Sequence, residues 1–527
     1  MKKRITALVL SIVMLFSATT ITSFADEYTE SEKTINTLGE DLLQGLVGLI
    51  AKLIKDPADW VAEDEYFKKN GVADKATEFV DEAQGDYWYL GYGSGSLQTG
   101  KELECYVGGS LSVTKKLATE VRDDQRVRTV AVSDGRAVHV FASLDCFGFA
   151  NSEVVKVRKM LEKYAKENNI ASINISALHQ HSCVDTYGMN GDIVNAILLG
   201  PVRNILGIEN PSGMDPDFMD HLYKTVIKSV EDAVEAMEPG NLYYGAVDAS
   251  KYIRDKRDPQ VIDPNINRFR FVPLDAESNE TWLVNTGIHT VGMGASGTIV
   301  TADYPYYMEK YIKEETGANF IMIQGAELAI TSEYGEELVA DAEVLKEYND
   351  EGYARLASYG YTLGELTCSI QDSKKLDPIL NYARATYTQR VENNIITLAA
   401  KCGLLSNTVV KSGDEYKVVT ELGYIEFGKD VAVVVAPGEL APEIAFGGAT
   451  TAEESWSGTT WDFAPIKDNV DGRTLIVFGL TNGQVGYMLT DNSWHSFLCE
   501  NEEIVTAGPD AGSTFTLNFY TLLGMVR

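Results

Sequence analysis

Two of the six histidines in the chain, His179 and His181, are separated by a single residue. The apolar run at 173–178 is typical of a buried β-strand, so the pair stands where that strand ends. Side chains at alternate positions of a strand point the same way, and both imidazoles would therefore face one spot. Two imidazoles crowded at a strand end indicate a metal site, a proton relay or both.

His289 and Glu439 have a similar setting. His289 follows a predicted strand at 282–286, and Glu439 follows the apolar run 431–435 and a Pro-Gly pair. Together with His179 they supply two imidazoles and one carboxylate, the ligand types of a catalytic zinc site. The three residues are far apart in the sequence, and a lone histidine at a strand end is more often a hydrogen-bonded structural residue. The ligand pattern alone is therefore weak, and taken by itself His289 is better interpreted as a structural residue.

Several other features are interpreted as structural. These include His139 in mid-strand, His221 on an amphipathic helix and His495 in a late loop. The glycines at 292–297 satisfy GxGxxG, but they run on into an apolar segment instead of opening a helix, which argues against a dinucleotide site. Residues 333–365 are acidic and rich in tyrosine, and we predict that they are peripheral.

Strands and helices alternate from about residue 87 onward, which predicts a mixed α/β domain over 87–527. The runs 137–144 and 173–178 predict two strands with a helix between them. Such a βαβ unit implies parallel neighbours and a right-handed crossover. In open parallel sheets ligands bind beyond the carboxyl ends of the strands, so Asp145 and His179 lie where a site belongs.

Residues 26–86 predict a helical N-terminal extension, because apolar residues recur at helical spacing over 38–54. One interpretation is an interfacial helix that approaches membranes or lipid aggregates. The other is a helix packed on the domain. We favour packing, because a lipid-binding helix usually carries a basic polar face and only Lys52 and Lys55 would serve here.

The first 25 residues predict a secretory signal peptide. Lys2, Lys3 and Arg4 precede an apolar run at 5–16, and Ala25 ends a small-residue cleavage site. The run is too short for a stable membrane anchor, and no later run approaches the ~20 residues that a spanning helix needs. We therefore expect a secreted, extracellular and soluble protein.

Composition excludes some classes of protein and of partner. Hydrophobic residues make up 45% of the chain, which suits a globular protein and excludes a disordered one. The net charge of −32 makes nucleic acid a poor partner, because phosphate binding needs a cationic face. Six cysteines allow 15 disulfide pairings, and the spacing selects none of them. We expect Cys183 to be a small packed residue or a partner of Cys146, rather than a metal ligand or a nucleophile.

Six short motifs follow one another in the order found in the neutral (alkaline, non-lysosomal) ceramidase family. They are NISALHQHS at 174–182, Lys-Arg-Asp-Pro at 256–259, a Gly-Ile-His-Thr to Thr-Ala-Asp segment at 287–303, Gln-Gly-Ala at 324–326, Ala-Pro-Gly-Glu at 436–439 and Gly-Tyr at 486–487. From about residue 87 to its end the chain thus resembles the catalytic domain of that family. Each motif alone is modest evidence, whereas six in the family order are strong.

The resemblance implies one zinc ion and hydrolysis of the amide of ceramide to sphingosine and fatty acid. Carried over onto this sequence, the zinc ligands are His179, His289, Glu439 and Tyr487. Tyr487 then also counts as catalytic, and His181 suits a base that takes a proton from the attacking water and delivers it to the leaving amine. Arg257 would stabilise the oxyanion of the tetrahedral intermediate. Asp145 and Asp303 are predicted to orient the histidines as hydrogen-bond acceptors.

The chain departs from the family pattern around the polar end of the substrate. Cys-Val-Asp at 183–185 replaces Gly-Pro, and Glu-Leu-Ala at 327–329 replaces a Gly-Asp run. The family's serine falls near Thr331 or Ser332, and Cys499 stands where the family has a tyrosine. These changes affect the predicted headgroup more than the predicted metal.

The expected fold is mixed α/β, with stacked β-sheets flanked by helices and the 26–86 extension packed on them. The chain stops at Arg527, so we expect no C-terminal immunoglobulin-like domain. The expected function is secreted, zinc-dependent hydrolysis of an N-acyl lipid such as ceramide. Two alternatives stay open: the same site hydrolyses another acyl amide or ester, or the chain is a non-catalytic binding homologue. Transient contact with a membrane or lipid aggregate also stays open.

Overall fold

The computed structural model describes residues 30–72, 74–109, 117–188, 212–295, 297–372, 374–495, 497 and 503–526. The predicted signal peptide and Cys499 lie outside these residues. Among the helices that are described, none is long and apolar enough to cross a membrane.

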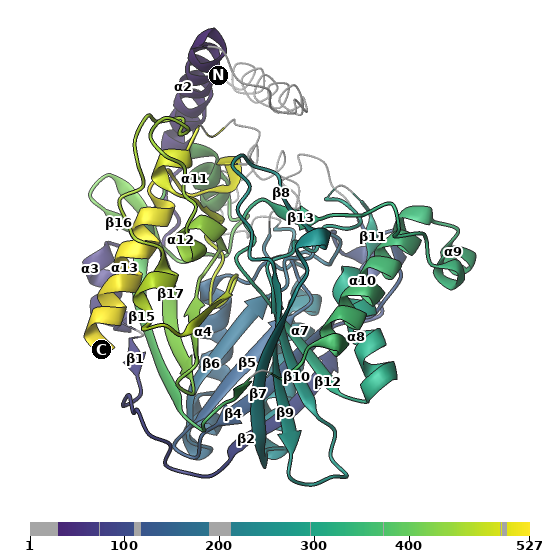
Figure 1. Ribbon diagram of the computed structural model, residues 1–527. Helices are drawn as coiled ribbons and strands as arrows, with labels where there is room; N and C mark the ends of the chain where they lie inside the picture. The colour runs from purple at the N-terminus through teal and green to yellow at the C-terminus, as the bar shows by residue number, and fades with distance from the viewer. Residues whose placement is uncertain are drawn as a thin grey trace.

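Two β-sheets stack face to face at the centre of the molecule, and helices cover their outer faces (Figure 1). In the described part of the chain the larger sheet has nine strands in the order β12-β10-β9-β7-β2-β4-β5-β6, with β14 beside β7. Its strands are β2 (Trp88–Ser96), β4 (Arg126–Ser133), β5 (Val138–Leu144), β6 (Ile170–Ala177), β7 (Glu238–Asp248), β9 (Asn265–Pro273), β10 (Thr281–Thr286), β12 (Asn319–Gln324) and β14 (Lys374–Lys375). Most neighbours are antiparallel, but β5 and β6 are parallel, and so are β10 and β12.

The smaller sheet has the order β1-β15-β17-β18-β20, with β16 beside β17. Its strands are β1 (Lys75–Ala76), β15 (Leu380–Arg390), β16 (Val409–Ser412), β17 (Glu415–Phe427), β18 (Val431–Val435) and β20 (Thr474–Phe478). Apolar side chains of both sheets fill the space between them, and the rings of Phe141 and Phe478 meet edge to face with centroids 5.9 Å apart. Burial of this apolar surface from both sides stabilises the stack.

Helices form the two outer layers. The outer face of the larger sheet packs against α4 (Asn151–Met160), α7 (Pro216–Glu235), α8 (Asp303–Thr316) and α10 (Glu351–Ser369). The outer face of the smaller sheet packs against α13 (Ala511–Val526). The remaining helices are α2 (Glu30–Leu53), α3 (Glu63–Asn70), α5 (Glu162–Glu167), α9 (Ala342–Tyr348), α11 (Asn394–Lys401) and α12 (Pro442–Phe446). Three short two-stranded sheets join β3 (Glu120–Val121) to β11 (Ile299–Val300), β8 (Ile253–Asp255) to β13 (Ile330–Ser332), and β19 (Glu439–Leu440) to β21 (Tyr487–Met488).

The predicted fold class and βαβ unit are confirmed. Strand β5, helices α4 and α5, and strand β6 follow in that order, and β5 and β6 pair in parallel. The prediction that residues 333–365 are peripheral is wrong for their second half. Tyr353 and Tyr359 of α10 are fully buried against α8, and their hydroxyl groups donate to Asp123 and to the carbonyl of Tyr252.

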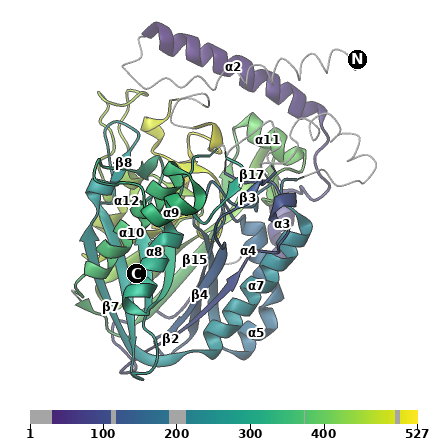
Figure 2. The same cartoon turned by 90° about the vertical axis from the view of Figure 1, so that its right-hand side faces the viewer.

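Helix α2 lies across one end of the molecule and packs on α11 (Figure 2). Leu43, Val47 and Ile50 form a buried cluster with Ile395 and Leu398. The helix is therefore packed on the body of the protein, as its sequence favoured. Farther along the N-terminal segment, β1 pairs with β15 and so joins this segment to the smaller sheet.

Candidate metal centre

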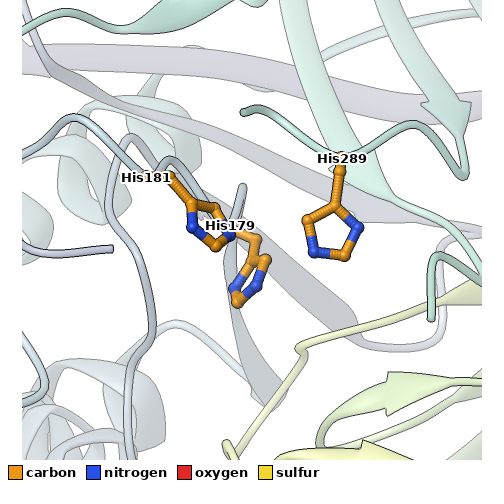
Figure 3. A group of neighbouring side chains, drawn as sticks. All are labelled: His179, His181 and His289. Atoms are coloured by element: carbon orange, nitrogen blue, oxygen red, sulfur yellow. The ribbon is translucent and has the colours of Figure 1, made fainter. Parts of the chain in front are cut away.

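The predicted site residues lie just beyond the ends of buried strands. His179 stands two residues after β6, and His289 stands three residues after β10. Glu439 begins β19, four residues after β18. Figure 3 shows the imidazoles of His179, His181 and His289 side by side, and their ring centroids are 4.6 to 5.5 Å apart.

Backbone hydrogen bonds hold the two histidine loops together. The amide of His181 donates to the carbonyl of Thr290 at 3.1 Å, and the Thr290 hydroxyl donates to the carbonyl of Leu178 at 2.6 Å. Gly287 and Gly325, which follow β10 and β12, lie so close that a Cβ on Gly287 would stand 2.4 Å from the carbonyl oxygen of Ala326. Only glycine permits this approach, which brings the segment carrying His289 against the Gln-Gly-Ala segment.

Backbone carbonyls fix the tautomers of His179 and His289. Nδ1 of His179 lies 2.8 Å from the carbonyl oxygen of Phe147, and Nδ1 of His289 lies 3.0 Å from that of Glu327. A carbonyl oxygen only accepts, so each Nδ1 carries a hydrogen, and in the neutral ring each Nε2 presents a lone pair. This is the arrangement that metal-binding histidines adopt.

The two free Nε2 atoms converge on one carboxylate oxygen. Oε2 of Glu439 lies 3.4 Å from Nε2 of His179 and 3.3 Å from Nε2 of His289. Burial alone would raise the pKa of Glu439, but His179 and His289 hold it well below its usual value. Burial would lower the pKa of His179, and Glu439 reverses this and raises it. The three groups thus form a buried electrostatic unit with its donor atoms facing one another.

This donor set fits a divalent cation such as zinc. Two donors that each lie about 2.1 Å from an ion, at a tetrahedral angle, stand about 3.4 Å apart, which matches the spacings from His179 and His289 to Glu439. Oε2 of Glu439 also lacks a hydrogen bond of normal geometry, although it is buried. A cation would satisfy all three donors at once.

Tyr487 lies beside Glu439, although they are 48 positions apart in the sequence. The two residues are register partners in the parallel pair β19–β21, and Tyr487 is buried. Register partners in a sheet project to the same face. The structure thus brings Tyr487 next to the carboxylate with which it was predicted to act.

His181 differs from the other two histidines because its ring interacts with the backbone of Gly109 without the geometry of a normal hydrogen bond. Within the described residues neither of its ring nitrogens makes a hydrogen bond of normal geometry. The ring stands edge-on to Phe147, 5.1 Å between centroids, and is the most exposed of the three imidazoles. Burial and the neighbouring His179 and His289 hold the pKa of His181 well below its usual value, so the ring is neutral at neutral pH.

Arg257 has no described contact with the histidines. Its guanidinium donates to both carboxylate oxygens of Glu443, at 2.9 Å each, and to Asp255. Glu443 belongs to α12, four residues after Glu439. Arg257 thus lies near the site, but four of its five N–H groups donate hydrogen bonds to the carboxylates of Asp255 and Glu443.

The predicted orienting role of Asp145 and Asp303 is wrong. Asp145 pairs with Arg128 and accepts from Gln180, the residue between the two neighbouring histidines. Asp303 accepts from the backbone amide of Tyr304, and among the described residues neither aspartate has a hydrogen bond to His179 or His289, whose Nδ1 atoms bond carbonyls. Backbone carbonyls take the orienting role instead, and sequence reasoning could not assign that role because every residue carries one.

Three predicted polar-end features also have defined places. Thr331 and Ser332 lie in β13, which pairs with β8. Strand β8 ends two residues before Arg257. Cys183 is a buried free thiol that donates to the carbonyl of Gln180, so it is packed rather than paired with Cys146.

Glu327 was noted only as a departure from the family pattern, yet the structure places it in the site. It is fully buried, and one of its oxygens lies 3.8 Å from Nδ1 of His289. Its donor atom also lies within 4.8 Å of those of His179 and Glu439. Its position just beyond the apolar strand β12, matching that of His289 beyond β10, was the available sequence signal.

No protein-family model matches the chain, and no curated protein matches its sequence. Solved structures do match. Neutral ceramidase from Pseudomonas aeruginosa gives a TM-score of 0.61 at 14% sequence identity, over 84% of this chain and 74% of that one. A ceramidase complexed with C2 gives a TM-score of 0.61 at 14% identity, over 84% and 76%. The chain therefore has the neutral ceramidase-like fold that its ordered motifs predicted.

Proposed function

We propose that this protein is an exported, zinc-dependent amide hydrolase that cleaves the N-acyl bond of ceramide or a related N-acyl lipid. The observation that carries the proposal is the convergence of His179 Nε2 and His289 Nε2 on one buried oxygen of Glu439. The neutral ceramidase-like fold supports it, because the two similar solved structures named above are ceramidases. Export follows from the predicted signal peptide.

His179, His289 and Glu439 would hold the ion, with Tyr487 beside them. When bound, the ion supplies Lewis-acid activation of water and polarises the amide carbonyl. The preset tautomers matter here, because the lone pairs of His179 and His289 already point inward and no ring has to turn.

His181 would move the proton. Within the described residues its ring nitrogens make no hydrogen bond of normal geometry, and its centroid lies 4.6 Å from that of His179. It can therefore take a proton from the attacking water and deliver it to the nitrogen of the leaving amine. The amine needs this proton in order to leave as a neutral group.

Arg257 is better suited to positioning than to direct oxyanion contact. Its bidentate bond to Glu443 ties the β8 region to α12, and α12 follows Glu439 directly. Such a buried, hydrogen-bonded pair keeps the Glu439 segment in place. Tyr487, on the same face as Glu439, is then the protein group best placed to donate to the developing oxyanion.

The test uses zinc-loaded protein and a panel of N-acyl substrates that includes ceramide, simpler fatty amides and an acyl ester, with fatty-acid release as the readout. We expect ceramide-like amides to be cleaved, activity to be lost with a chelator, and zinc to restore it. His179→Ala and Glu439→Ala should lose both bound zinc and turnover. His221→Ala, a histidine change on α7 away from the site, should retain both.

Each other outcome selects an alternative. Release from the ester or from simple amides alone would keep the metal site and replace the substrate. Zinc binding without release from any substrate would identify a binding homologue. Full activity of His179→Ala or Glu439→Ala would overturn the proposed site.

A further inference from the structure

Two buried carboxylates stand next to each other in the centre, and they differ in their surroundings. Glu439 faces two imidazoles, whereas neither oxygen of Glu327 makes a hydrogen bond of normal geometry within the described residues. Glu327 is 0% exposed. Burying a carboxylate without donors is expensive, so this side chain needs either a cation or a proton.

The position of Glu327 favours a cation. One of its carboxylate oxygens, Nε2 or Nδ1 of His179 and an oxygen of Glu439 all lie within 4.8 Å of one another. Glu327 thus belongs to the same group of close donor atoms as two of the three residues that would hold the ion, His179 and Glu439. Burial and the nearby charge of Glu439 raise the pKa of Glu327 well above its usual value, and a bound cation would cancel both effects.

The backbone of the same residue is already part of the centre. The carbonyl of Glu327 holds Nδ1 of His289 at 3.0 Å, so the peptide that carries the carboxylate also orients a ligand. Parallel pairing of β10 with β12, with Thr286 in register with Gln324, fixes the relative positions of the two loops. The carboxylate is thus delivered by the same rigid sheet edge as the imidazole.

We propose that Glu327 is a further ligand of the cation bound by His179, His289 and Glu439. The inference rests on the metal site of the proposed function but not on its substrate. A second carboxylate adds negative charge and a hard oxygen donor, so the site would hold a divalent cation more tightly and would accept oxygen-preferring ions such as Mn²⁺ alongside Zn²⁺. It would also raise the number of protein ligands above the three supplied by His179, His289 and Glu439.

The test compares wild-type protein with Glu327→Gln, which keeps the shape and removes the charge. In chelator competition we expect Glu327→Gln to lose affinity for Zn²⁺ and Mn²⁺ by about 100-fold or more. Loss of a residue that only orients a ligand typically lowers metal affinity by about 10- to 100-fold, so a larger loss indicates a ligand. In Co²⁺-loaded protein, the visible absorption should gain intensity in Glu327→Gln, because loss of a ligand lowers the coordination number toward four.

Asp303→Asn is the matched control, since Asp303 is also buried with one unpartnered carboxylate oxygen but belongs to neither group of close donors. It should leave Zn²⁺ affinity and the Co²⁺ spectrum unchanged. Folding is checked by the melting temperature of the metal-free proteins. Glu327→Gln should melt no lower than wild type without metal, because it removes an uncompensated buried carboxylate, yet gain less on adding Zn²⁺.

Equal metal affinity and identical Co²⁺ spectra for wild type and Glu327→Gln would overturn the inference and make Glu327 a neutral, protonated acid. Failure of the proposed function looks different. If no N-acyl substrate is cleaved but Glu327→Gln still weakens metal binding, the ligand role stands and the substrate assignment fails.

Discussion

At the scale of single residues, the three neighbouring imidazoles differ in whether a backbone carbonyl accepts a hydrogen bond from Nδ1. Carbonyls of Phe147 and Glu327 hold Nδ1 of His179 and His289, whereas neither ring nitrogen of His181 makes a hydrogen bond of normal geometry in the described part of the chain. An anchored ring presents one fixed lone pair, which suits a ligand, and an unanchored ring can take up and release a proton, which suits a base.

His181→Ala should therefore keep the metal and lose rate. We expect metal content equal to that of wild type and turnover lower by about 10²- to 10⁴-fold, the usual contribution of a general acid or base. Metal analysis and fatty-acid release on the same samples check this. Because His181 also lies within 4.8 Å of the donor atoms of His179 and His289, loss of metal in this variant would make it a ligand and would contradict the base role.

At the scale of elements, the two sides of α2 have opposite environments. Leu43 is 5% exposed in the cluster shared with α11, whereas the adjacent Leu42 is 72% exposed. The apolar spacing predicted this helix, but only its packing against α11 decides which leucines are buried.

Leu43→Ala should destabilise the protein by about 2–5 kcal/mol, as buried leucine truncations do, because it leaves a cavity between α2 and α11. Leu42→Ala is the matched control and should change the free energy of unfolding by no more than about 0.5 kcal/mol. Denaturant titration of both variants measures the difference. Equal effects would mean that α2 does not pack on α11 in solution.

The error over residues 333–365 also belongs to this scale. Acidic residues and tyrosines indicate a solvated segment when they are counted along the chain. In the structure the hydroxyl groups of Tyr353 and Tyr359 are satisfied by Asp123 and a backbone carbonyl, so both rings can be fully buried against α8. The amino-acid composition of the segment cannot show which groups accept these two hydrogen bonds.

At the scale of the whole molecule, a histidine in the central core makes the fold sensitive to acid. His139 of β5 is 2% exposed, bonds Ser172 and packs its ring 5.1 Å from that of Tyr382, between the two sheets. Burial lowers its pKa to about 3. The folded state therefore resists protonation that the unfolded chain accepts near pH 6.5.

This depressed pKa means that stability is complete above about pH 6.5 and falls as the pH drops toward 3. At pH 4.5 the loss due to His139 should reach about 2–3 kcal/mol, because that pH lies two units below the unfolded value. The test compares metal-free wild type with metal-free His139→Gln. Between pH 7 and pH 4.5 the free energy of unfolding should fall by about 2–3 kcal/mol less in His139→Gln than in wild type. An equal fall in both proteins would show that His139 is hydrated or already charged.

The sequence by itself determined the alternation of strands and helices, the strand ends that carry His179, His289 and Glu439, and the order of motifs that predicted a neutral ceramidase-like fold. These features are local, because burial of an apolar run and the change to polar residues at its end are written in consecutive positions. Tertiary structure alone decided that backbone carbonyls orient His179 and His289, that Arg257 pairs with Glu443, and that Glu327 lies close to His179 and Glu439. Each of these depends on which distant segments meet at one sheet edge. A backbone carbonyl has no sequence pattern that reveals its partner, and the position of Glu327 beyond an apolar strand does not say which groups it meets.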